Sequence, residues 1–166
     1  MLGLGNILLH DEGVGVRVIE RLQKLYSFPP NVRILDGGTL GMDLLPYVEA
    51  ADRLVVIDAL DTGAKPGTIT RLEGDTVPSF VGIKMSPHQM GLADLLAAAH
   101  LCECCPTTLV LWGIQPQAID LSLDLSPKVA AQVPVVAEKI VGELRQWGIE
   151  FTQKGGSEVI ADEDES

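Results

Sequence analysis

The sequence predicts an α/β fold: a three-layer α/β/α sandwich around a mostly parallel, twisted sheet of about five strands. Two observations support this prediction. Segments rich in branched apolar residues, at 32–36, 54–58 and 109–113, each end in an acidic residue or a glycine, as buried strands often do. Between them, apolar residues recur at steps of three or four, which indicates helices. Strands that alternate with helices form a parallel sheet covered on both faces.

The first helix is predicted over residues 13–26. Val14, Val18 and Leu22 fall on one face of it, and two prolines at 29–30 end it and lead into the strand at 32–36. The remaining predicted elements are a short helix over 41–49, a strand of mixed polarity at the sheet edge over 68–72, a helix over 89–101, and a final helix over 129–147, which Pro134 kinks or restarts.

Composition limits the possible partners. The chain has 166 residues and a formal net charge of −11, with Lys+Arg 12 against Asp+Glu 23. Nucleic acids and anionic lipids are bound by clustered Lys and Arg, so the sequence predicts neither as a partner. Its longest apolar stretches are far shorter than the roughly 20 residues that span a bilayer, and no export signal is visible. We therefore expect a cytoplasmic protein without a membrane segment.

The composition changes near the C-terminus. A single domain is predicted over residues 1–150, as expected for a chain of about this length. Residues 151–166 are rich in Gly, Ser and acidic residues, including Asp162-Glu163-Asp164-Glu165, and are predicted to be a disordered acidic tail. We expect the protein to be a monomer.

Three cysteines lie within four positions, at Cys102, Cys104 and Cys105. Such close spacing does not match a disulfide framework. A zinc site would need a fourth ligand and the two-residue spacer of a zinc knuckle. We therefore expect reduced thiols that take part in ordinary packing.

Acidic and imidazole side chains are predicted to gather at one edge of the sheet. Glu12 precedes the first helix, Asp58 ends a strand, and His88 precedes the helix over 89–101. In a doubly wound sheet, ligands bind outside the carboxyl ends of the strands. Two carboxylates and one imidazole would form a mixed oxygen and nitrogen site suited to a borderline divalent ion such as nickel or zinc, with one coordination position left open.

Each of these residues also has an ordinary structural interpretation. Asp11 or Glu12 would cap a helix and complement its dipole, and Asp36 would hold a turn. His88 would be a polar residue whose hydrogen bonds are satisfied near a helix N-terminus. Asp58 fits such an interpretation least, because a carboxylate that follows four apolar residues is costly to desolvate without a partner.

The glycine-rich opening, Gly3-Leu4-Gly5-Asn6, raises two nucleotide-related alternatives. A dinucleotide fingerprint needs a third glycine that opens the helix, whereas here Asp11 and Glu12 would place two negative charges where a pyrophosphate binds. A peptidyl-tRNA hydrolase needs a basic groove for tRNA, which conflicts with the net charge of −11. Neither activity is predicted.

Four separated motifs occur in order along the chain. They are Gly3-Leu4-Gly5-Asn6-Ile7-Leu8-Leu9-His10-Asp11-Glu12-Gly13-Val14-Gly15, Asp36-Gly37-Gly38-Thr39, Val56-Ile57-Asp58-Ala59 and Ser86-Pro87-His88-Gln89-Met90-Gly91-Leu92. Over about residues 1–149, the chain resembles the hydrogenase maturation proteases, endopeptidases that trim the C-terminus of a [NiFe]-hydrogenase large subunit. Four separated motifs that occur in this order indicate a family far more specifically than any single motif does.

The resemblance implies roles for individual residues. Glu12, Asp58 and His88 match the metal-binding triad, and Asp36-Gly37-Gly38-Thr39 matches a motif associated with substrate recognition near the cleavage site. The family cleaves after nickel insertion, so the divalent metal, nickel, would be supplied by the substrate, a [NiFe]-hydrogenase large-subunit precursor. The family is grouped with aspartic-type peptidases, which makes Asp58, with Glu12, the candidate catalytic carboxylate. A carboxylate base and polarisation of the carbonyl by the metal both remain open.

The chain departs from the resemblance at its first strand. In the family this strand begins several residues earlier, and the stub before Gly3 would weaken the sheet unless the true start lies upstream or the remaining residues rebuild the strand. A binding module that recognises the metallated precursor without cutting it would share every residue named above. Only an activity measurement separates that alternative from the endopeptidase.

Overall fold

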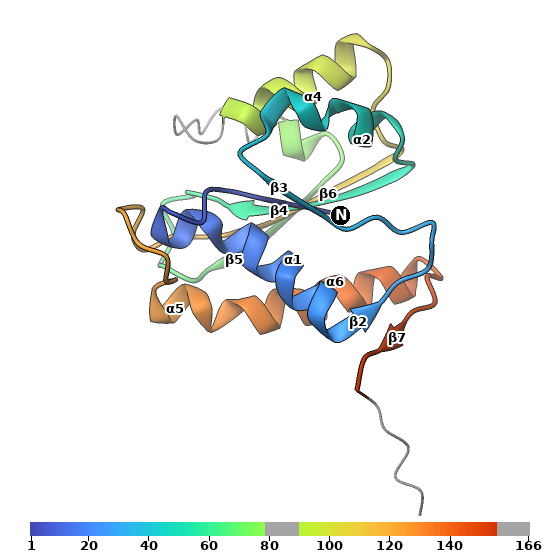
Figure 1. Ribbon diagram of the computed structural model, residues 1–166. Coiled ribbons are helices and arrows are strands. Elements are labelled where there is room, and N and C mark those ends of the chain that lie inside the picture. Colours follow the sequence, from blue (N-terminus) through green and yellow to red (C-terminus); the bar gives the residue numbers. More distant parts are fainter. Residues whose placement is uncertain (79–89, 156–166) are drawn as a thin grey trace, which may run out of the picture.

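The computed structural model describes residues 1–78 and 90–155. Its elements form three layers, with a sheet between two layers of helices (Figure 1). In chain order they are β1 (Leu2–Leu4), η1 (His10–Gly13), α1 (Val14–Leu25), β2 (Tyr26–Ser27), β3 (Leu35–Gly38), η2 (Gly41–Leu44), α2 (Leu45–Glu49), β4 (Arg53–Ala59), β5 (Ile69–Glu73), α4 (Met90–Leu101), β6 (Thr108–Ile114), α5 (Pro127–Ala130), α6 (Gln132–Gln146) and β7 (Thr152–Gln153).

The central sheet has five strands in the order β3-β1-β4-β6-β5. The pairs β1 with β3, β1 with β4 and β4 with β6 are parallel, and β5 is antiparallel to β6 at the sheet edge. Helices α2 and α4 cover one face, and α1, α5 and α6 cover the other (Figure 1). These observations confirm the predicted α/β/α sandwich and its edge strand.

Side chains of the central strands alternate between two hydrophobic cores. On β4, Val55 and Ile57 pack on the core formed with α1 and α6, whereas Leu54 and Val56 pack on the core formed with α2 and α4. This is the period of two expected for a strand that is buried on both faces. Asp58 continues the series of Leu54 and Val56, so its side chain is directed to the α2 and α4 face.

Two predicted elements differ in their bounds. The strand expected over 32–36 begins only at Leu35 and continues to Gly38, so Asp36 lies inside it and not at its end. The chain is still turning before Leu35, because the Val32 amide donates a hydrogen bond to the Pro29 carbonyl at 2.9 Å. The final helix is interrupted after α5, and α6 restarts at Gln132 with Pro134 in its first turn.

A second, two-stranded sheet was not predicted. Tyr26 of β2 pairs with Gln153 of β7, and Ser27 pairs with Thr152, in antiparallel order. Regular pairing therefore continues past residue 150. Among residues 1–78 and 90–155, no helix is long and apolar enough to cross a membrane.

Candidate active site

Two of the predicted site residues, Glu12 and Asp58, line the same pocket at the carboxyl edge of the sheet. The pocket has a volume of about 260 Å³. Glu12 comes from η1 and Asp58 from the end of β4, and both are buried. The other lining residues come from the end of β1 and the segment after it, the end of β3 and the η2 region, and the first half of α4: Leu4, Gly5, Asn6, Gly38, Thr39, Gly41, Leu44, Gly91, Leu92 and Leu95.

The Asp58 carboxyl lies in apolar surroundings. Its side chain is directed toward Leu44 and Leu95, which belong to the core beneath α2 and α4. Burial raises the pKa of Asp58 from its usual 3.8 to about 8. The Ala59 amide donates to Asp58 Oδ1 at 2.8 Å, which opposes this rise, and the negative charge of Glu12 adds to it. A perturbed carboxyl group in a pocket is typical of a functional site.

Two glycines allow η1 to lie against the strand ends. Gly5 has a φ of +116°, and a Cβ atom there would lie 1.7 Å from the Glu12 carbonyl oxygen. A Cβ atom on Gly15 would lie 2.2 Å from the Ile57 carbonyl oxygen. The backbone of Glu12 thus approaches the end of β1, and the start of α1 approaches β4, more closely than any larger residue permits.

Asp11, the neighbour of Glu12, has a different role. It is fully buried, and its carboxylate accepts hydrogen bonds from the amides of Gln117, Ala118 and Ser126 and from the Ser126 hydroxyl, at 2.7–3.0 Å. Burial raises the pKa of Asp11, but these hydrogen bonds outweigh it and lower the pKa below its usual value. The interpretation of Asp11 as a helix cap is therefore wrong, because it holds the segment that follows β6.

The motif Asp36-Gly37-Gly38-Thr39 only partly reaches the pocket. Gly38 and Thr39 line it, and the Gly38 carbonyl accepts the Gly5 amide at 3.0 Å. Gly37 is buried, and a Cβ atom there would lie 2.8 Å from the Leu4 side chain. Asp36 is exposed and does not belong to the pocket lining.

The third predicted metal ligand, His88, lies outside the described residues. Within residues 1–78 and 90–155, no three His, Cys, Asp or Glu side chains form a group that could hold a metal ion. The described part of the pocket contributes the two carboxylates of Glu12 and Asp58. Gly91, in the first turn of α4, lines the same pocket three positions after His88 in the sequence.

Comparison with known proteins identifies the family. A family model described as "HycI: Hydrogenase maturation protease" matches residues 16–143. The chain is 47% identical over 155 residues to the hydrogenase expression/formation protein HupD of Rhodobacter capsulatus, covering 92% of this chain and 74% of that protein. The chain belongs to the hydrogenase maturation protease family.

Further relatives agree with this assignment. The hydrogenase 2 maturation protease of Escherichia coli K12 is 41% identical over 151 residues, covering 90% of this chain and 92% of that protein. The solved structure of the hydrogenase maturating endopeptidase HybD from E. coli matches with a TM-score of 0.86 and 40% sequence identity, covering 94% of this chain and 97% of that one. Both the fold and the sequence therefore place this maturation protease among peptidases.

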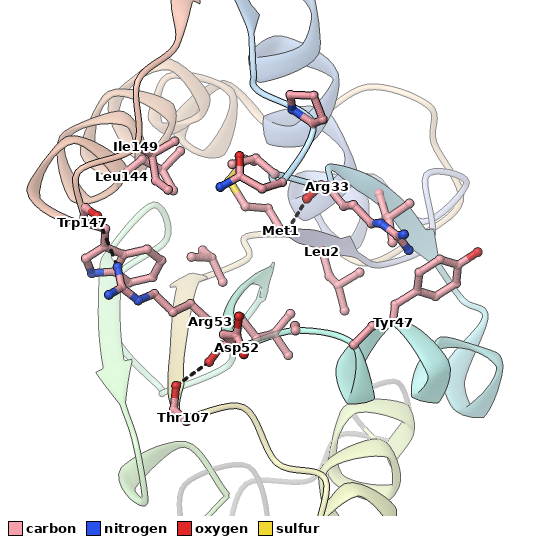
Figure 2. Close-up of a pocket in the computed structure, with 18 residues that line it drawn as sticks. Met1, Leu2, Arg33, Tyr47, Asp52, Arg53, Thr107, Leu144, Trp147 and Ile149 are labelled. Carbon is pink, nitrogen blue, oxygen red and sulfur yellow. Dashed lines mark hydrogen bonds between the residues drawn. The ribbon is translucent and has the colours of Figure 1, made fainter.

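A larger cavity of this maturation protease lies elsewhere. It has a volume of about 720 Å³ and lies at the amino edge of the sheet, beside the start of β1 and β4 (Figure 2). Two of its polar groups donate to backbone carbonyls: the Met1 amino group to that of Arg33 at 2.5 Å, and the Thr107 hydroxyl to that of Asp52 at 2.7 Å. Among the described residues that line it, the one acidic residue is the exposed Asp52, so the smaller pocket with Glu12 and Asp58 is the better candidate for hydrolysis.

The cysteines are also distant from the pocket. Cys102, Cys104 and Cys105 are free thiols, as predicted, and they follow the C-terminal end of α4. This end precedes the first residue of β6 and therefore lies toward the amino edge of the sheet. The described structure offers no cysteine nucleophile near Asp58.

Proposed function

We propose that this chain is an aspartic-type endopeptidase that removes the C-terminal extension of a [NiFe]-hydrogenase large-subunit precursor after nickel insertion. One observation carries the proposal: the carboxylates of Glu12 and Asp58, contributed by separate elements, are both buried and share one pocket at the edge of the sheet where ligands of such folds bind. Membership of the family supports the hydrogenase precursor as the substrate.

Nickel enters this proposal as part of the substrate. Glu12, Asp58 and His88 supply oxygen and nitrogen donors of the kind that borderline divalent ions accept. Together they would complete the coordination of nickel held by the precursor and fix the scissile bond beside the pocket. Cleavage would then report that metal insertion is complete. The observation in favour is that the two carboxylates already face one cavity, next to the helix that His88 precedes.

Asp58 is assigned as the general base. Its Oδ1 atom is held by the Ala59 amide, so the carboxyl group has a fixed orientation. The step needs Asp58 in its ionised form, which the positive charge of the substrate's nickel would favour over the neutral form that burial favours. A water oxygen then bonds to the scissile carbonyl carbon while the Asp58 carboxylate takes the water proton. When the C–N bond breaks, Asp58 returns this proton to the departing nitrogen, and the extension leaves as a free peptide. The proton balance requires no other donor.

The glycines of the β3 end suit an extended peptide substrate. Gly38 lines the pocket with its backbone, and no side chain at this position would keep a substrate backbone away. Thr39 adds a hydroxyl group beside it. We assign these two residues to contact with the segment around the scissile bond.

Turnover by single variants tests these roles. With a nickel-loaded precursor and mass spectrometry of the released extension, Asp58→Asn is expected to lower kcat by about 10²–10⁴, the usual contribution of a general base. Asp52→Asn, at an exposed position just before the opposite end of β4, is the matched control and is expected to retain kcat within about twofold. Wild-type kcat in Asp58→Asn would overturn the assignment of the base.

A further inference from the structure

Exposed apolar side chains are concentrated on three segments at the carboxyl edge of the sheet, where the carboxylate pocket also lies. Within residues 1–78 and 90–155, ten large hydrophobic residues are exposed, and seven of them belong to three segments at the carboxyl edge of the sheet. We call these seven residues the apolar rim: Ile7, Leu8, Leu40, Met42, Ile119, Leu121 and Leu123.

Two segments of the apolar rim adjoin residues that line the pocket, and the third is hydrogen-bonded to one of them. Ile7 and Leu8 follow the lining residue Asn6, and Leu40 lies between the lining residues Thr39 and Gly41. The third segment, with Ile119, Leu121 and Leu123, is joined to the first through the backbone. The Ser122 amide donates to the Leu8 carbonyl at 3.0 Å, and the His10 amide donates to the Ser122 carbonyl at 2.9 Å.

This third segment is held firmly although it is a loop. Asp11 accepts the amides of Gln117, Ala118 and Ser126, and the Arg17 guanidinium donates to the Leu123 carbonyl at 3.1 Å. The hydrogen bonds to Asp11 lie on both sides of the exposed residues. The apolar side chains are therefore presented on a fixed backbone, which lowers the entropic cost of binding a partner.

The exposure of these side chains has no explanation in the packing of the chain. Leu121 is 81% exposed and Leu123 is 61% exposed, so neither contributes appreciably to a core. Contiguous exposed apolar residues mark interaction surfaces. They are interspersed with the exposed carboxylates of Asp120 and Asp124, and the chain carries a net charge of −11. A partner would need an apolar surface flanked by neutral or basic residues.

We propose that the apolar rim is the docking surface for the folded body of the hydrogenase precursor, whose extension enters the carboxylate pocket. This inference rests on the proposed function. A pocket of about 260 Å³ is smaller than the usual site for a drug-sized ligand, so it accommodates only the short stretch around the scissile bond. Recognition of a folded protein needs a larger contact, and two segments of the apolar rim directly adjoin residues that line the pocket.

Binding and turnover of rim variants test the docking surface. Binding of nickel-loaded precursor is measured in an Asp58→Asn background so that the precursor is not consumed. Leu121→Asp and Leu123→Asp are expected to raise Kd by about tenfold or more, as for residues at the centre of an interface. Leu101→Asp is the matched control, because Leu101 is 83% exposed but lies at the far end of α4, and its Kd should stay within about twofold.

The outcomes separate docking from catalysis. With Asp58 present, Leu121→Asp should raise KM for the folded precursor and leave kcat unchanged. An unchanged Kd in both rim variants, with cleavage intact, would overturn the docking surface and leave the proposed function standing. Tight binding that depends on Leu121, without cleavage by the wild type, would support the docking surface and refute the endopeptidase. A wild-type dimer in sedimentation that Leu121→Asp dissociates would overturn the proposal in favour of a contact between two copies.

Discussion

Replacing Asp58 with asparagine is expected to stabilise the metal-free protein at neutral and alkaline pH. Burial raises the pKa of Asp58 from 3.8 to about 8, so the native state holds a proton that the unfolded chain releases near pH 4. The stability that comes from this proton is fully present below about pH 4 and is lost progressively up to about pH 8. Asparagine does not ionise, and its side-chain oxygen can still accept the Ala59 amide.

The size of the effect follows from the pKa difference. Between 3.8 and about 8, at ~1.36 kcal/mol per pKa unit, the limit is roughly 6 kcal/mol. Relaxation and water entry reduce such penalties in real proteins, so we expect Asp58→Asn to gain about 2–4 kcal/mol near pH 8. Below about pH 4 the gain should be close to zero, because Asp58 is then protonated in both states.

Urea unfolding in the presence of a chelator measures this gain across the same pH range. The wild-type free energy of unfolding should fall relative to that of Asp58→Asn between about pH 4 and about pH 8. Asp36→Asn, at an exposed position of β3, is the control and should follow the wild-type curve. Parallel pH profiles for wild type and Asp58→Asn would refute the reasoning that burial of Asp58 is costly.

Three further substitutions test the framework around the pocket. Asp11→Asn removes a carboxylate that accepts four hydrogen bonds, so it should lower the free energy of unfolding in urea by about 3 kcal/mol above about pH 4. This loss should shrink as the pH falls through the lowered pKa of Asp11, and a loss that does not depend on pH would contradict the prediction. Gly5→Ala places a Cβ atom against the Glu12 backbone and should lower Tm by several degrees or prevent folding; an unchanged Tm would show that the close approach is not required. Glu143→Ala removes the carboxylate that accepts a hydrogen bond from the buried Trp112 indole at 2.9 Å, so it should lower the free energy of unfolding by about 2 kcal/mol. Equal urea midpoints for the variant and the wild type would contradict this prediction.

The strongest strands could be predicted from local sequence. The apolar runs of β4 and β6 are buried on both faces, so nearly every residue is hydrophobic and the prediction needs no knowledge of neighbours. The start of β3 was misplaced because residues 32–34 include two branched apolar residues, Val32 and Ile34, but follow a turn at Pro29. Its end was missed because Gly37 and Gly38 are residues that strands usually avoid. The pairing of β2 with β7 joins segments of two residues each, which carry no periodicity.

The candidate site was predictable only in part. Asp58 is identified by its apolar run, because a carboxylate there must be buried. The different roles of Asp11 and Glu12 could not be predicted from the sequence, because the amides that donate to Asp11 belong to residues 117, 118 and 126, more than 100 positions away. The apolar rim was missed for the same reason. Ile119, Leu121 and Leu123 read as loop residues until the fold brings them beside Leu8.

The dependence of cleavage on nickel in the substrate is the most direct test of the proposed function. Purified protein is incubated with the nickel-loaded large-subunit precursor and with its nickel-free form, and release of the extension is followed by mass spectrometry. The proposal predicts cleavage of the nickel-loaded precursor alone, with loss of this cleavage in Asp58→Asn. Equal cleavage of both forms, or tight binding of the loaded precursor without any cleavage, would contradict a nickel-gated endopeptidase.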